Sequence, residues 1–473
     1  MIDVQPVFLW TDLLLFGLIT CIALAAWRAR RSEPMRAAWR RVGESAVGMT
    51  SLSILLLFLV VGLVDSLHYR PYLPPAKDDK LVADRGPLST EVRSALDALA
   101  EPLRTRTEKT YSAPLAYVLF AKQTIEKADG TQQREFPRLK FGGSGLQYPE
   151  EDHAGDVLGR IGLGLALAAG AWCALAGALV QGVAMSRQVP FGAAWRAVWR
   201  GKGGLAWRAV LVTLGLVFLF AGPIAVLAGE YHVFGTDKVG QDVLFLTLKS
   251  IRTALVIGTL TTLVTLPMAV ALGIMAGYLG GWVDDCIQYV YTVLNSIPGV
   301  LLIAAAVLMM QVVIDTHPHW FETAAERADA RLLALCLILG MTSWTGLCRL
   351  LRGETLKLRE LEYVQAARAF GVSTARILSR HVLPNLMHLV LIALVMDFSG
   401  LVLAEAVLSY VGIGVDPNTV SFGTMINAAR MELAREPMVW WSLMSAFIFM
   451  FVLVLAANLF ADVVRDAFDP RAS

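Results

Sequence analysis

The chain has few charged side chains for its length. Asp, Glu, Lys and Arg make up 17% of its 473 residues, whereas 56% of the residues are hydrophobic. Soluble domains average about 25% charged residues. This shortage of charge excludes an ordinary soluble protein and indicates that much of the chain lies in a membrane.

Cysteine is also scarce, and the five thiols show no recognisable framework. They lie in or beside apolar stretches without C-x-x-C spacing: Cys21, Cys173, Cys286, Cys336 and Cys348. The pattern argues against a disulfide scaffold or a metal cluster and favours small buried hydrophobic side chains. His317 and His319 have no thiol or carboxylate partner at ligand spacing, so they are weak evidence for zinc.

Signatures of catalysis are missing as well. The sequence has no G-x-x-x-x-G-K-[ST] phosphate loop, because the segment that begins at Gly201-Lys202 lacks both the spacing and the hydroxyl. It shows no H-E-x-x-H motif and no Ser/His/Asp or Cys/His arrangement. We therefore expect neither enzymatic activity nor a bound cofactor or metal in this chain.

Long apolar runs are abundant. We predict nine membrane helices, each close to the roughly 20 residues that cross a bilayer. They lie near 7–27, 46–66, 157–185, 209–229, 251–277, 290–314, 331–349, 385–410 and 440–464. The fold class is therefore all-α and polytopic.

The distribution of basic residues predicts the orientation of these helices. Arginine and lysine are concentrated in 28–41, 187–208 and 349–380, and basic loops favour the cytoplasmic side. The first run has Asp3 before it and arginines after it, which is the reverse of a cleavable signal peptide. We expect a retained anchor with the N-terminus outside, and nine spans then place the C-terminus in the cytoplasm.

The composition divides the chain into four parts. Residues 1–66 hold two membrane helices and a basic loop, and 67–156 form an external insert. Residues 157–208 hold a third membrane helix and a basic segment, and 209–473 hold six further spans. In the insert, Ser89 or Thr90 is expected to cap a helix. The insert suits either a folded spacer or a docking surface for an external partner, and the sequence does not separate these interpretations.

The basic segment 191–208 interleaves tryptophan with arginine. Tryptophan favours the membrane interface, and arginine favours anionic headgroups. We therefore expect a helix on the lipid surface rather than a nucleic-acid-binding site.

Residues 360–384 form a basic, amphipathic segment between two spans. Spacing of about one turn places Leu361, Val364, Ala367 and, less closely, Phe370 on one apolar side of a helix. Gly371 permits a turn, Ser373 is expected to cap a second helix, and Pro384 suits the first turn of the next span. Such a segment is typical of a docking site for a partner on the water side, although an amphipathic connector on the membrane remains the simpler alternative.

This segment resembles the cytoplasmic "EAA" loop of permease subunits of ABC importers. Three further segments resemble motifs of the peptide/nickel permease family in order along the chain. They are His232-Val-Phe-Gly-Thr-Asp-Lys-Val-Gly-Gln-Asp-Val243, Gly277-Tyr-Leu-Gly-Gly-Trp-Val-Asp284 and Ala404-Glu-Ala-Val-Leu-Ser-Tyr-Val-Gly-Ile-Gly-Val-Asp-Pro417. The chain departs from the family at Gln241, where arginine is usual, and at Gln365, where the loop has its glutamate.

The resemblance implies a type I ABC importer permease in a bacterial inner membrane. Its partners would be a second permease, two ATP-binding subunits that use ATP and magnesium, and an extracytoplasmic solute-binding protein. The ATPase-coupling residues would be Glu362, Gln365, Ala366, Ala367, Gly371, His381 and Pro384. The residues that face the binding protein or the path would be Gly235, Thr236, Asp237, Asp242, Glu405, Gly412, Gly414 and Pro417. The solute would be a di- or oligopeptide, or nickel or another small solute.

Two other functions remain open at this point. Asp397 and Glu405 lie within a predicted span, and intramembrane acids are typical of proton-coupled transporters. Alternatively, the 67–156 insert would make the chain a membrane scaffold or sensor.

Overall fold

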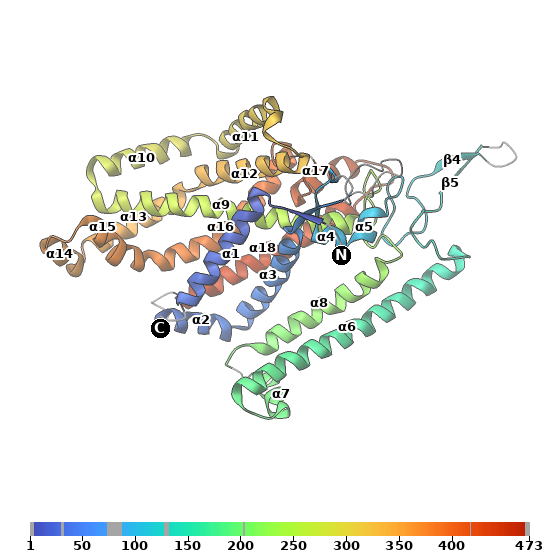
Figure 1. Cartoon of the computed structure of the whole chain (residues 1–473), viewed down its shortest axis with the longest axis horizontal. Helices are drawn as coiled ribbons and strands as arrows, with labels where there is room; N and C mark the ends of the chain where they lie inside the picture. Colours follow the sequence, from blue (N-terminus) through green and yellow to red (C-terminus); the bar gives the residue numbers. More distant parts are fainter. Residues whose placement is uncertain are drawn as a thin grey trace, which may run out of the picture.

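A computed structural model describes residues 4–29, 33–72, 88–126, 132–201, 204–416 and 418–468. Helices dominate it (Figure 1). Within these described ranges, eight helical stretches are long and apolar enough to cross a membrane. They are α3 (Ala46–Asp65), α6 (Pro149–Arg187), α8 (Trp207–Leu227), α9 (Val243–Leu279), α11 (Gly299–Thr316), the α12–α13 stretch (Ala324–Arg359), the stretch that ends with α16 (Thr374–Val411) and α18 (Trp441–Phe468). Helix α1 (Trp10–Ala29) contains a shorter apolar stretch, Trp10–Leu24. The predicted polytopic helical fold is confirmed.

The predicted span near 290–314 was wrong at its start. The chain forms α10 (Gly281–Ser296) and then α11, which begins at Gly299. Pro298 stands between them as the N-cap of α11. Proline lacks a backbone N–H and disfavours helical backbone at the residue before it, so one helix ends and another begins here. The broken α10–α11 element runs back over α9 (Figure 1).

Helix α3 packs directly against the core, along α9 and α18. Gly62 allows a close approach to α9, because a β-carbon there would lie 2.5 Å from Cδ1 of Leu255. Helix α8 instead pairs along its length with α6, and α7 (Phe191–Trp199) closes this hairpin (Figure 1). The four-part division of the chain stays a prediction, but this packing associates α3, rather than α8, most closely with α9 and α18.

Three apolar clusters of the described residues join helices around α9. One joins α3, α9, α16, α17 (Phe422–Glu432) and α18 around Trp441 and Phe422. A second joins α9, α10, α13 (Thr345–Arg359) and α16 near the basic loops. The third joins α1, α9, α11 and α12 (Ala324–Ser343) around Leu339. Helix α9 contributes to all three and therefore lies at the centre of the helical bundle.

Small sheets lie at the end of the molecule where the insert is found. Strand β1 (Val4–Val7) pairs antiparallel with β2 (His68–Pro71), and β2 pairs with β3 (Arg93–Ser94). The register Val7↔His68 ties the start of the chain to the residues that follow α3. Strands β4 (Gln123–Glu126) and β5 (Gln132–Glu135) form a separate hairpin that projects from the insert (Figure 1).

The predicted helix cap in the insert was wrong. Two short helices follow β3, α4 (Ala95–Leu99) and α5 (Glu101–Thr105). Ser94, rather than Ser89 or Thr90, caps α4 by accepting a hydrogen bond from the backbone N–H of Asp97 at 3.1 Å. The cause is tertiary, because pairing of Arg93 and Ser94 with β2 delays the helix start.

The basic segments lie together at one end of the bundle. Helices α2 (Glu33–Glu44), α7 and α14 (Glu362–Ala369) are found there with the last described turns of α18 (Figure 1). The insert and α17 lie at the opposite end (Figure 1). The short helix η1 (Pro318–Trp320) joins α11 to α12. This separation agrees with the predicted topology, in which the basic loops share one side of the membrane.

Candidate functional site

The first candidate site is the segment that follows α13. It consists of α14, the turn at Gly371, α15 (Thr374–Ile377) and the π-helical turn η2 (Leu378–Val382), which leads into α16 (Leu383–Val411). Val364, Ile377 and Val382 are almost fully buried in the cluster shared with α9, α10, α13 and α16. The segment is therefore packed against α9, α10, α13 and α16 and is not a loose loop.

Gly371 ends α14 in a geometry that favours glycine. Its φ is +73°, in the left-handed region. The N–H of Val372 donates to the carbonyl of Ala367 at 3.1 Å, and the N–H of Gly371 donates to that of Arg368 at 3.0 Å. These two bonds form a Schellman motif, which satisfies the last carbonyls of a helix. The predicted turn at Gly371 is present, whereas Ser373 makes no capping hydrogen bond with its side chain.

The predicted apolar face of α14 is only half correct. Val364 is buried and Ala367 packs against the same cluster, but Phe370 is 87% exposed. Leu361 and Ala366 are exposed as well. Three steps of three residues rotate a position by about half a turn at 3.6 residues per turn, so Leu361 and Phe370 lie on opposite sides of the helix. The exposed ring of Phe370 is available to a partner.

A polar cavity of about 410 Å³ lies between this segment and the nearby ends of α9 and α13. Arg359, Glu360, Gln365 and Arg368 line it together with apolar residues of α14 and α15. The Nε2 of Gln365 donates to the carbonyl oxygen of Glu360 at 3.2 Å and lies 3.3 Å from its carboxylate. The glutamine at the place of the family's glutamate therefore closes a local contact, and Glu362 on the first turn of α14 is exposed.

The end of the segment is held to its beginning. Asn385 donates to the hydroxyl of Tyr363 at 3.0 Å and to the carbonyl of His381 at 2.7 Å. The rings of Tyr363 and His381 lie 6.0 Å apart. Pro384 occupies the first turn of α16, as predicted. These contacts join α14 to the start of α16, so movement of one is transmitted to the other.

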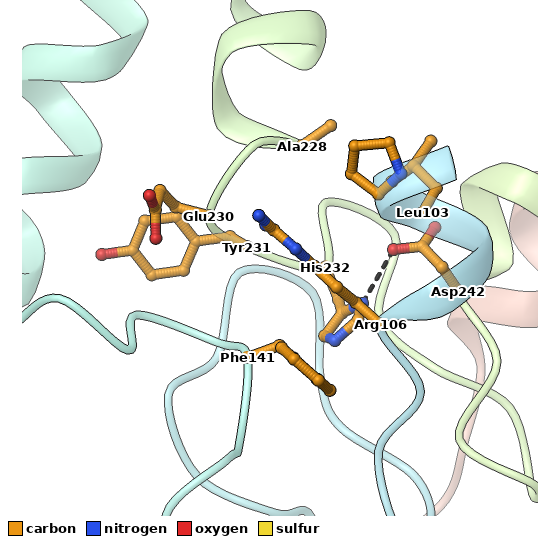
Figure 2. Close-up of a pocket in the computed structure, with 9 residues that line it drawn as sticks. Leu103, Arg106, Phe141, Ala228, Glu230, Tyr231, His232 and Asp242 are labelled. Atoms are coloured by element: carbon orange, nitrogen blue, oxygen red, sulfur yellow. Dashed lines mark hydrogen bonds and ion pairs between the residues drawn. The ribbon is translucent and has the colours of Figure 1, made fainter. Parts of the chain in front are cut away.

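The second candidate site is the motif loop before α9, and it docks the insert. His232 Nδ1 lies 2.8 Å from an oxygen of Asp242, whose other oxygen accepts from the N–H of Leu244 at the start of α9 (Figure 2). Glu108 of the insert lies 3.7 Å from His232 Nε2 and accepts from two backbone N–H groups of the insert. The imidazole thus lies between a carboxylate of the core and one of the insert.

Gly235 and Thr236 of the motif are buried under the same contact, whereas Asp237 is half-buried. The Thr236 hydroxyl accepts from the N–H of Ser112 at 2.7 Å, and its carbonyl accepts from the indole of Trp441 at 3.0 Å. Gly235 leaves no room for a side chain against Ser112 and Trp441. Asp237 accepts from the N–H groups of Val239 and Gln241. Thr236 and Asp242 are shielded from solvent, so any effect of theirs on a binding protein would be indirect.

Sequence reasoning missed the insert's side of this contact. Glu108, Tyr111 and Ser112 belong to no motif, and the hydroxyl of Tyr111 donates to Glu432 of α17 at 3.2 Å. Phe120 packs edge-on against Trp441, with ring centroids 4.8 Å apart. Since these residues lie over a hundred positions from their partners, no local pattern marks them. The insert is joined to the core by specific contacts at the starts of both α9 and α18.

Charge linkage at His232 makes the docking of the insert pH-dependent. Burial by itself lowers the pKa of His232, but the hydrogen bond to Asp242 and the nearby charges of Asp242 and Glu108 outweigh it and raise the pKa from 6.5 to about 9. A histidine whose pKa rises on folding stabilises the fold fully below its unfolded pKa and loses that contribution as the pH passes its folded pKa. We expect the thermal unfolding midpoint of the purified protein to decrease as the pH is raised from 6.5 to 9.5. The corresponding loss in the free energy of unfolding is on the order of 3 kcal/mol.

The His232→Gln variant should be less stable at pH 6.5 and should lack most of this decline. His319→Gln, at an exposed histidine, is the matched control and should follow the wild type. An unchanged decline in His232→Gln would show that another group titrates.

Glu405 on α16 is buried and fully engaged. One of its oxygens accepts from Ser409 at 2.6 Å and from Ser421, the N-cap of α17, at 2.9 Å. Gly412 ends α16 with φ +86°, and a β-carbon at Gly414 would collide with Ser409. Glu405 therefore orients α17 against α16. Pro417 lies outside the described residues, and neighbouring Asp416 forms an ion pair with Arg331 of α12.

Asp397 differs from Glu405 in its burial and in its hydrogen bonding. It is half-buried and makes no hydrogen bond or ion pair within the described part of the chain. No hydrogen bond joins the two carboxylates, so the described residues contain no direct proton relay between them. His317 stacks on Trp320 with centroids 4.4 Å apart, and no three His, Cys, Asp or Glu side chains among the described residues are grouped to hold a metal.

Comparison with known proteins places the chain in a family. Residues 269–473 match the model of the binding-protein-dependent transport system inner membrane component. The oligopeptide transport system permease protein OppC of Mycobacterium tuberculosis is 34% identical over 244 residues, which cover 52% of this chain and 77% of the relative. The chain belongs to this family of transport permeases.

Other relatives of the permease carry related names. The dipeptide transport system permease protein DppC of Bacillus subtilis is 27% identical over 59% of this chain and 85% of its own length. The glutathione transport system permease protein GsiD of Pectobacterium atrosepticum is 31% identical over 51% of this chain and 73% of its own length. Among solved structures, an inward-facing MetNI methionine ABC transporter chain aligns with a TM-score of 0.36 at 15% identity, over 48% of this chain and 97% of that chain.

Proposed function

We propose that this chain is a permease subunit of an ATP-driven importer of di- or oligopeptides. It works with a second permease, two ATP-binding subunits and an extracytoplasmic solute-binding protein. The names of its relatives, which are oligopeptide, dipeptide and glutathione permeases, support this class of solute. Because the family is that of binding-protein-dependent transport permeases, we favour this function over a secondary transporter or a scaffold.

The observation that carries the proposal is the anchored segment around α14. It exposes Phe370 at the end of the bundle where the basic helices lie, and it buries Val364 and Ile377 among α9, α13 and α16 (Figure 1). Packed side chains transmit displacement between rigid elements. A push on α14 by an ATPase would therefore move three membrane helices together and open or close the path.

The proposed orientation follows from the same arrangement. The basic end with α2, α7 and α14 faces the cytoplasm together with the C-terminus, and the insert faces outward. Helix α7 carries Trp195 and Trp199 next to Arg196, which suits the inner lipid surface. ATP and magnesium belong to the partner subunits, and this chain holds no cofactor of its own.

Transport by the assembled complex tests the proposal directly. The permease would be co-expressed with a second permease and two ATP-binding subunits and reconstituted in proteoliposomes with the solute-binding protein. We expect ATP-dependent accumulation of radiolabelled trialanine, and none with an ATPase subunit that cannot hydrolyse ATP. Accumulation driven by a proton gradient without ATP would overturn the proposal.

Replacing Phe370 with alanine should weaken the contact with the ATPase. Loss of one exposed aromatic anchor typically costs about 1 kcal/mol or more of binding free energy, which corresponds to roughly a fivefold lower affinity. The measurement is retention of the ATPase subunits on immobilised, detergent-purified permease across a range of ATPase concentrations.

Phe136→Ala serves as its control, since that exposed ring lies on the insert at the opposite end. If the Phe370 and Phe136 variants retain the ATPase subunits equally well, Phe370 does not contribute to the docking surface.

A further inference from the structure

Helix α16 carries an exposed stripe along the bilayer. Met396, Gly400, Leu403, Val407 and Tyr410 recur at helical spacing and are exposed. The rest of α16 packs against α9 and α18, and next to the stripe the Ser399 hydroxyl donates to Asn458 of α18 at 2.6 Å. The stripe is therefore the side of α16 that this chain leaves uncovered.

Asp397 lies near the midpoint of the 29-residue helix, about 100° around it from Met396 and therefore beside that stripe rather than on it. A carboxylate at this depth is costly to hold in lipid, and such residues almost always face a bundle interior or a water-filled cavity. Within the described residues it has neither a hydrogen-bond donor nor a cation as partner. Any partner of this carboxylate therefore comes from outside these residues.

Glu405, two turns further along, shows how this helix stabilises an acid that has a structural role. It is buried, and two serine hydroxyls donate to it. Asp397 has no such donors and is partly accessible instead. Glu405 therefore holds two helices together, whereas the carboxylate of Asp397 is available to bind another group.

The surroundings of Asp397 leave space for a ligand. Gly400 is the next residue on the same side, one turn away, and a β-carbon built there meets no atom within 4 Å. Leu394, one turn before Asp397, adds exposed apolar surface beside the position. A carboxylate between apolar side chains complements an ammonium group carried on an apolar chain, since the charge is paired while its carbon neighbours contact hydrocarbon.

We propose that Asp397 lines the translocation path and binds the α-ammonium group of the peptide as it crosses the membrane. The residue would thereby select solutes with a free amino terminus at the permease itself. The inference rests on the proposed function, because it takes a peptide as the solute. A lysine or arginine of the second permease is the competing source of the cation.

The experiment compares two solutes in the reconstituted, complete complex. Radiolabelled trialanine and N-acetyl-trialanine differ in the ammonium group, and each is supplied at a concentration that saturates its uptake. The variants are Asp397→Asn, Asp397→Glu and, as an intramembrane control, Glu405→Gln. Co-purification of the second permease is measured for each variant.

We expect Asp397→Asn to lower the maximal uptake of trialanine at least fivefold relative to that of the acetylated peptide, with the second permease retained. Asp397→Glu should restore most of the preference. Glu405→Gln should change uptake of both peptides by the same factor, because that carboxylate orients α17.

Several results would overturn the inference. An unchanged ratio of the two uptakes in Asp397→Asn would do so, as would an equal fall for both peptides. Loss of the second permease from the purified Asp397→Asn complex would show that Asp397 pairs with a lysine or arginine of that subunit and not with the peptide. Failure of the wild-type complex to transport either peptide would instead count against the proposed function, so the two failures are distinguishable.

Discussion

Replacing Arg252 with methionine is expected to destabilise the permease by about 3–5 kcal/mol, the usual effect of removing one partner from a buried ion pair. Arg252 on α9 donates to Asp12 of α1 at 2.6 Å and to the Ser66 hydroxyl after α3 at 3.2 Å. Asp329 of α12 lies 3.9 Å away and accepts from Thr11. The variant would leave two buried carboxylates without their cation.

The loss is large because the network joins four parts of the bundle. Folded domains are stable by only about 5–15 kcal/mol in total, so a change of this size consumes a large share. We expect a marked drop in the yield of folded protein and in the thermal unfolding midpoint in detergent. His68 continues to contact Asp12 at 2.7 Å, which limits the damage on that side.

Two further variants establish the cause. The triple change Arg252→Met, Asp12→Asn and Asp329→Asn removes the charges together and should recover much of the lost stability, because no unpaired charge stays buried. Arg93→Met, which removes an exposed pair with Glu91, should shift stability by less than about 1 kcal/mol. Equal effects of Arg252→Met and Arg93→Met would show that the buried network contributes little.

The membrane helices were predictable because hydrocarbon imposes a length and a composition on any segment that crosses it. What hydropathy does not encode is which helix packs against which. Both α3 and α8 are apolar on all sides, and only the structure shows that α3 packs against α9 and α18 while α8 pairs with α6. The proline at position 298 indicated a helix break in the sequence, but the continuous apolar residues around it favoured a single span.

The candidate sites were recognised from their motifs, yet their roles depended on distant residues. Thr236 and Asp242 are buried by an insert whose contact residues show no local pattern. On α14, periodicity correctly predicted a buried Val364 but misplaced Phe370, because the rotation accumulates over three successive steps. Local chemistry, such as the turn at Gly371 and the proline that opens α16, was predicted best, since it depends on the backbone alone.

Replacing Gly371 with valine should uncouple ATP hydrolysis from transport. A β-branched residue resists the left-handed conformation that Gly371 adopts at φ +73°, and we assign this a cost of about 2 kcal/mol. The Schellman bonds from Gly371 and Val372 would open, and α14 would lose its fixed angle to α15. At 1.4 kcal/mol for each factor of ten, peptide uptake for each ATP hydrolysed should fall roughly 30-fold in proteoliposomes.

Gly353→Val provides the matched control. Gly353 lies in α13 near the same end of the bundle, and a β-carbon at either glycine meets no atom within 4 Å. The two positions differ in backbone conformation, since Gly353 is helical and Gly371 is left-handed. A large loss of uptake in the Gly371 variant alone would therefore be due to the turn itself. If both variants transport as well as the wild type, the angle between α14 and α15 does not couple movement of the ATPase to transport. The coupling would then depend on the packing of Val364 and Ile377 against the membrane helices.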